Sequence, residues 1–305
     1  MFYPVTIKYT MKFQSKMTDV IKVEADIVVV FGWEGKNKEL VLSEESSKID
    51  RALGGMLSEV AGIENFEGKP GNELLIHTHG KIPSSRVLLV GAGDLKELSV
   101  SDWQVVSARI GRAAKKVVAK RIAIALPEEI MAKFGVEKVS ENVVVGLRLG
   151  TYTFIKHQSE ELQKKEKEIE DVSILVSAPK LDEIMKGINR GIIVSDAVMF
   201  ARDLVNESPS VTTPKYLGEV ARRLAKPANK IIAEVLGVKE METLGMDALL
   251  SIARGSSQEP RFIHLTYAGG GNKTVVLIGK GVTFDTGGIS IKPSGDMDKM
   301  KFDMC

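Results

Sequence analysis

The stretch RVLLVGAGDLKELSVSDWQVVSARIGRAAKKVVAKRIAIAL, residues 86–126, contains two apolar runs on either side of an amphipathic segment. The runs, residues 86–90 and 122–126, are short and aliphatic, which is typical of buried strands. Between them, apolar side chains recur at near-helical spacing from Asp102 to Ala119, which predicts a helix capped by Ser101. A strand, a helix and another strand in this order indicate an α/β architecture.

The same alternation extends in both directions along the chain. Further strands are expected at residues 26–31, 74–77, 172–177, 261–267 and 274–279, and helices at residues 141–151 and 181–206 and from Thr213-Pro214 onward. A highly charged stretch, Lys156–Asp171, is expected to be solvated and near a domain boundary. We therefore predict an α/β domain over residues 1–180, followed by a second α/β domain with a mostly parallel sheet over residues 181–305.

The composition is that of an ordinary globular protein. Of the 305 residues, 44% are apolar and 27% are charged, and 42 basic residues against 40 acidic ones leave a formal charge of +2. This charge gives no basis for nucleic acid or an anionic membrane as the partner. The single cysteine, Cys305, cannot form an intrachain disulfide, and no apolar stretch approaches the length of a spanning helix. We expect a cytoplasmic protein that acts on small molecules or peptides.

The segment VLIGKGVTFDTGGISIKPSGDMDKMKFDMC, residues 276–305, gathers lysines and aspartates around glycines. Lys280 follows the strand expected at 274–279, and ligands of open α/β sheets bind where strands end. Partial desolvation there would favour the neutral amine, which can act as a metal ligand or a base. Asp285 and Asp303 supply hard oxygen ligands, and one carboxylate can bridge two metal ions. The segment thus predicts a metal site.

Two alternatives apply to the same residues. The segment could be a surface loop whose lysines and aspartates pair with one another, because exposed ion pairs are common. Asp296 and Asp298 could compete with Asp303 as ligands, although capping of a turn or helix is their expected role.

The order of residues in this segment resembles the signature of the leucyl (cytosol) aminopeptidase family, which consists of two-metal exopeptidases. GKGVTFDTGGISIKP, residues 279–293, and MDKMKFDM, residues 297–304, match that signature at nearly every position, with Thr286 where serine is usual. ARDLVNESPSVTTP, residues 201–214, and LGMDALLSIARGS, residues 244–256, are similar to the family's upstream segments. Residues 1–180 resemble the family's amino-terminal, macro-like α/β domain in outline.

The resemblance implies a role for each matching residue. Lys280 and Asp285 would be metal ligands, with Asp285 bridging both ions, and Asp303 would bind the second ion alongside Lys280. Lys292 would be catalytic, polarising the scissile carbonyl and stabilising its oxyanion. The cofactors would be two divalent ions, Mn²⁺ or Zn²⁺. The substrates would be peptides with a free amino terminus, such as leucyl peptides, and the assembly a homohexamer.

One part of the family pattern is missing. The NTDAEGR-type segment, which supplies a further aspartate, a glutamate and an arginine in relatives, does not occur among these 305 residues. We therefore expect an incomplete catalytic domain and a chain that is inactive alone. Two alternatives are a non-catalytic regulatory or DNA-binding role through residues 1–180, of which the charge balance disfavours DNA binding, and an unstable remnant with an uncovered sheet.

Overall fold

The computed structural model describes residues 11–176, 179–225 and 230–304, except for the side chain of Asp303. The chain divides into two compact units, Met1–Phe200 and Ala201–Cys305, and each is described by itself. Within the described ranges, none of the helices combines the length and apolarity needed to cross a membrane.

The first unit is built on a seven-stranded sheet with the order β1-β7-β6-β2-β5-β4, and β3 pairs with β2 outside this path. The strands are β1 (Lys12–Met17), β2 (Ile27–Glu34), β3 (Leu40–Leu42), β4 (Glu73–His77), β5 (Arg86–Gly91), β6 (Arg121–Ala125) and β7 (Asp171–Val176). The β1–β7, β7–β6, β6–β2 and β2–β5 pairs are parallel. Strand β4 pairs antiparallel with β5, and β3 pairs antiparallel with β2. The predicted α/β class is confirmed, and the sheet of this unit is mostly parallel.

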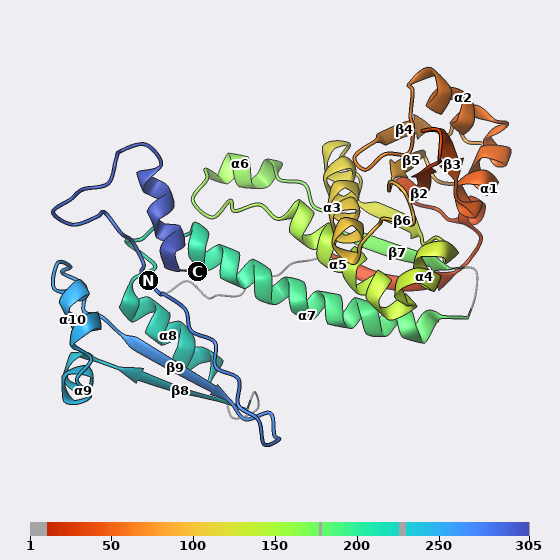
Figure 1. The fold of residues 1–305 in the computed structure, drawn as a ribbon. Coiled ribbons are helices and arrows are strands. Elements are labelled where there is room, and N and C mark those ends of the chain that lie inside the picture. Colours follow the sequence, from red (N-terminus) through yellow and green to blue (C-terminus); the bar gives the residue numbers. More distant parts are fainter. Residues whose placement is uncertain (1–10, 177–178, 226–229, 305) are drawn as a thin grey trace. The chain divides into compact units, whose positions relative to one another are not determined.

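The central strand β2 is buried on both faces. Ile27, Val29 and Phe31 belong to a core covered by α3 (Val100–Lys116) and α5 (Val136–Thr151). Val28 and Val30 belong to a second core, covered by α1 (Glu44–Leu53) and α2 (Met56–Ile63). Figure 1 shows the two helix layers around the strands. A strand buried on both faces is expected to be apolar throughout, and this explains the uninterrupted IVVVF run.

Helices α3 and α5 approach each other closely through glycines on α5. A Cβ added at Gly146 would lie 2.4 Å from the Gln104 carbonyl oxygen, and one added at Gly150 would lie 2.4 Å from the Ala108 carbonyl oxygen. These distances are far shorter than any van der Waals contact. Glycine is therefore required at both positions if the two helices keep this separation.

Helix α7 (Leu181–Asn206) has the predicted bounds and is tied to α5 by the buried Arg148. The guanidinium donates to the Ser195 hydroxyl at 2.8 Å and to the Ile192 carbonyl at 3.1 Å, and it pairs with Asp196 at 2.7 Å. Two shorter helices, α4 (Glu128–Phe134) and α6 (Glu160–Lys165), complete this part of the chain. Helix α6 buries no residue, as predicted for the charged stretch that contains it.

Two predicted helix starts in the first unit are wrong. The cap of α3 is Ser99, not Ser101: its hydroxyl accepts from the Asp102 amide at 3.1 Å, and the Asp102 carboxylate accepts from the Ser99 amide at 2.9 Å. This reciprocal pair satisfies two amides at once, so the helix begins earlier. Helix α5 begins at Val136 rather than residue 141, because Val136 and Val139 are buried in the core.

The second unit begins with α8 (Pro214–Leu224), whose predicted start is confirmed by the Thr213 hydroxyl, which accepts from the Tyr216 amide at 3.3 Å. The other elements are β8 (Ile231–Leu236), α9 (Val238–Thr243), α10 (Asp247–Ala253), β9 (Phe262–Tyr267) and the 3-10 helix η3 (Met297–Met304). Strands β8 and β9 pair antiparallel, which differs from the parallel pairing expected here. Two short helices connect them in place of a single crossover helix.

The strand predicted at residues 274–279 is wrong. This segment has no strand assignment, and Val276, Leu277 and Ile278 are 72%, 92% and 93% exposed. An apolar run forms a buried strand only when neighbouring strands supply hydrogen bonds and a core. In the part of the chain that the structure describes, β8 and β9 pair only with each other.

We expect Gly146→Ala to destabilise the protein by about 1–3 kcal/mol, the usual cost of overpacking, because its Cβ would collide with α3. Urea unfolding measures the change. Gly62→Ala is the matched control, since a Cβ there meets nothing within 4 Å and lies in α2. The control should be neutral or stabilising by up to about 1 kcal/mol. Equal stability of the two variants would contradict the close packing of α3 on α5.

The buried Glu45 of α1 should make stability depend on pH. Burial raises the pKa of its carboxyl above the ordinary 4.5, so the folded state holds this proton more tightly than the unfolded state. Stability is therefore lost as pH rises from about 4.5 through the raised pKa. We expect Glu45→Gln to be more stable than the unchanged chain at about pH 8, with the difference shrinking toward about pH 4.

Urea unfolding at both pH values measures this difference, with the exposed Glu59 of α2 as the matched site. Glu59→Gln should show no comparable trend. A stability difference for Glu45→Gln that stays constant across the pH range would contradict a raised pKa of Glu45.

Candidate functional site

The candidate site lies in a glycine-rich loop between β9 and η3. The Lys292 amide donates to the Thr286 carbonyl at 2.9 Å and closes the loop. Gly287 has φ +91°, and a Cβ there would lie 2.4 Å from the Ser290 carbonyl oxygen. Both the left-handed backbone and the close approach require glycine. The turn brings Lys292 back toward Asp285.

Asp285 and Lys292 form the centre of the site. The Lys292 Nζ lies 2.9 Å from Asp285 Oδ2, and the Gly287 amide donates to Asp285 Oδ1 at 2.8 Å. The Lys292 hydrogen bond, the Gly287 amide and the positive charges of Lys292 and Lys280 hold the pKa of the Asp285 carboxyl below its ordinary value. Asp285 is therefore ionised at neutral pH. The side chains of the pair are about a third exposed, so their attraction adds little stability.

Helix η3 contributes a contact that the sequence did not predict. The Lys292 ammonium also lies 3.2 Å from the Met300 Sδ. Lys301 donates to the Asn206 carbonyl at 3.1 Å and so anchors η3 to the end of α7.

The two other predicted metal ligands are placed differently. Lys280 is exposed, so the predicted desolvation at the end of a buried strand is wrong, because no strand precedes it. Its charge nevertheless acts on Asp285. The backbone of Asp303 lies in η3, but its side chain is outside the described residues. Asp296 pairs with Lys299 at 2.8 Å, as expected for a residue in a turn.

The donor set fits part of a metal site. Asp285 offers an ionised carboxylate whose Oδ2 accepts a hydrogen bond from the Lys292 ammonium. Hard divalent cations prefer carboxylate oxygens as ligands. Within the ranges that the structure describes, however, no group of three or more His, Cys, Asp or Glu side chains comes together to hold an ion. The described residues thus include one candidate carboxylate ligand but not a complete metal-binding set.

Comparison with known proteins places both units in one family. Residues 27–161 match the family model of the amino-terminal domain of the cytosol aminopeptidase family, and residues 199–305 match the model of its catalytic domain. The loop between β9 and η3 therefore lies in the part of the chain that matches the catalytic domain.

Similar proteins bear related names. A probable cytosol aminopeptidase of Alkaliphilus metalliredigens is 34% identical over 297 residues, covering 96% of this chain and 58% of the relative. One from Geobacter sp. is 36% identical over 257 residues, covering 84% of this chain and 51% of the relative. The chain thus spans about half the length of these relatives.

Solved structures agree with the sequence comparisons. A mutant of tomato leucine aminopeptidase is similar with a TM-score of 0.78 and 26% identity, over 98% of this chain and 58% of that structure. The bottromycin maturation enzyme BotP, in complex with Mn, is similar with a TM-score of 0.69 and 26% identity, over 92% of this chain and 53% of that structure. With both domain models matched in order along one chain, this protein belongs to the cytosol aminopeptidase family.

Proposed function

We propose that this chain contributes Lys280, Asp285, Lys292 and Asp303 to the two-metal site of an aminopeptidase, which removes amino-terminal residues such as leucine from peptides. Membership of the family supports the reaction class. The observation that carries the assignment of residues is the 2.9 Å contact between Lys292 and Asp285. It joins the proposed catalytic cation to the proposed bridging ligand within one turn.

Each residue has a role that suits its chemistry. Asp285 would hold two divalent ions, Mn²⁺ or Zn²⁺, and Lys280 and Asp303 would serve as further ligands. When bound, the ions supply Lewis acidity and an acidified water. Lys292 presents its ammonium beside the ligand carboxylate, where it can hydrogen-bond the oxygen of the scissile carbonyl and stabilise the developing negative charge. BotP, described in complex with Mn, supports the choice of a divalent ion.

The proposal also covers the cellular location, the substrates and the assembly of the enzyme. We place the reaction in the cytoplasm and its substrates among peptides with a free amino terminus, in line with the names of the relatives. The proposed assembly is a homohexamer.

We expect no release of leucine from a leucyl anilide by the purified 305-residue chain, with either Mn²⁺ or Zn²⁺ added. The physical reason is the ligand set: among the described residues, too few donors come together to hold two ions. A chromogenic assay measures the release. Release that disappears in Lys292→Ala would contradict the proposed inactivity while supporting the assigned site.

A chimera tests the assigned residues directly. It joins residues 1–305 to the remaining carboxyl-terminal part of the Alkaliphilus metalliredigens relative. We expect metal-dependent release of leucine, and a roughly 10²–10³-fold lower kcat for Lys292→Ala, the usual effect of removing one donor to an oxyanion.

Lys299→Ala is the matched control for the chimera. This lysine lies in the same segment and pairs with Asp296 instead of Asp285. Its kcat should stay within about twofold of the unchanged chimera, as is typical for an exposed ion pair. Equal losses in the two lysine variants would refute the assignment of Lys292.

A further inference from the structure

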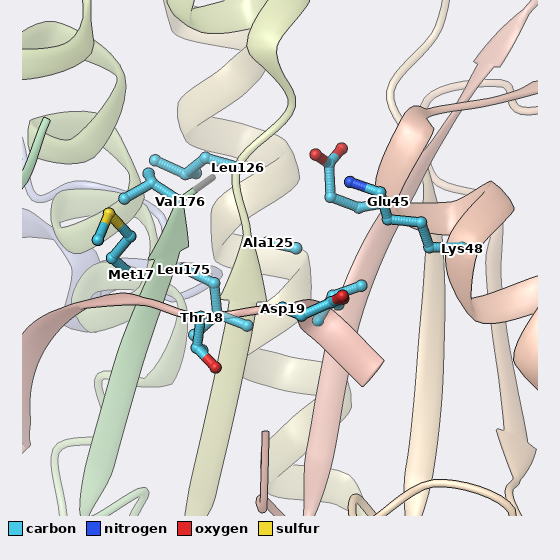
Figure 2. Close-up of a pocket in the computed structure, with 10 residues that line it drawn as sticks. Met17, Thr18, Asp19, Glu45, Lys48, Ala125, Leu126, Leu175 and Val176 are labelled. Atoms are coloured by element: carbon cyan, nitrogen blue, oxygen red, sulfur yellow. The ribbon is translucent and has the colours of Figure 1, made fainter. Parts of the chain in front are cut away.

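The first unit contains a cavity of about 320 Å³ at the ends of its parallel strands (Figure 2). It is lined by the carboxyl ends of β1, β6 and β7, by the start of the 3-10 helix η1 (Val20–Lys22) and by the first turns of α1. Open α/β sheets bind their ligands at this edge. The volume lies in the range of small-molecule sites.

The floor of this cavity is apolar and well ordered by packing. It consists of the buried residues Val20, Ala125, Leu126, Leu175 and Val176. Ala125 presents only a methyl group between larger neighbours, which leaves room above the strand ends. Such a floor suits a short aliphatic group, because burying that group removes apolar surface from water.

One wall of the cavity carries an acid with one unpaired oxygen. Glu45 is only 7% exposed, and among the described residues its Oε2 has no hydrogen-bond partner. The neighbouring Lys48 is engaged by Glu44, with 2.7 Å between Nζ and Oε1. Figure 2 shows Glu45 and Lys48 extending from α1 on one side of the cavity, opposite Leu126 and Val176 on the other. A buried polar atom without a partner is costly, so a ligand that donates to Glu45 would remove this cost.

The charges around the cavity favour a positively charged ligand over a negatively charged one. Asp19 stands exposed at the rim and adds a second negative charge. Lys48, also in the lining, pairs with Glu44, and its positive charge acts on Glu45 and Asp19 as well, so acidic groups still outnumber basic ones here. An anionic ligand would meet two carboxylates. A protonated amine would instead form a charge-assisted hydrogen bond, which is stronger than a neutral one.

We propose that this cavity is a binding site for a small organic amine, whose ammonium group hydrogen-bonds Glu45 and whose aliphatic body rests on the floor formed by Ala125 and its neighbours. The site lies in the first unit and shares no residue with the proposed aminopeptidase site. It therefore stands or falls independently of the proposed function.

Isothermal titration calorimetry of the full 305-residue chain with isoamylamine tests the site. We expect saturable binding with a Kd on the order of millimolar, as fits a ligand with few heavy atoms. Isoamyl alcohol has the same body without the charge, and isocaproate has a similar body with the opposite charge. Both should bind at least about tenfold more weakly, because neither can form the charge-assisted bond.

Three variants decide the location of binding. Glu45→Gln should weaken isoamylamine binding at least about tenfold, the effect of losing one hydrogen bond to a charged group. Ala125→Leu should abolish binding by filling the cavity, while Glu59→Gln on the exposed side of α2 should leave the Kd unchanged. Circular dichroism and thermal melting check that each variant is folded, and Glu45→Gln is decisive if Ala125→Leu fails to fold. The proposal is overturned by an absence of saturable binding, by tighter binding of isocaproate, or by equal binding to Glu45→Gln.

Discussion

Burial of β2 on both faces is the constraint on which the first unit depends. Because this strand is apolar from Ile27 to Phe31, neither face can be left to water. Helices must therefore pack on both faces of the sheet. The connections between its parallel strands carry these helices, some over one face and some over the other. The same connections place the carboxyl ends of β1, β6 and β7 along one edge, where the cavity beside Glu45 opens.

The two candidate sites differ in how their geometry is maintained. The cavity beside Glu45 is built from buried side chains of strands and a helix, so its shape follows from the packing of the whole unit. The contact between Asp285 and Lys292 is local and partly exposed, and it depends on the tight turn at Gly287. The first site is thus specified by the fold, whereas the second is specified by a short sequence.

How far the sequence predicts the structure depends on the range of the interactions involved. The helix Leu181–Asn206 and the cap at Thr213 follow from local signals and are confirmed. The apolar run at residues 274–279 predicts a strand, but the structure has none there. Strand formation depends on pairing with distant segments, which a local pattern does not show. In the site, the residue order indicates that Asp285 and Lys292 act together, and they do meet. Glu45 was missed because an acid in a polar helix start looks solvated until the packing around it is known.

The exposed run Val275–Ile278 has a consequence for the behaviour of the chain in solution. Four exposed β-branched or aliphatic residues in a segment outside any helix or strand, without charge or proline, have the composition from which intermolecular β-sheets grow. Lys273 and Lys280 flank this run and place like charges at its two ends. Repulsion between these charges on neighbouring chains would oppose such stacking, and a rise in ionic strength would weaken that repulsion.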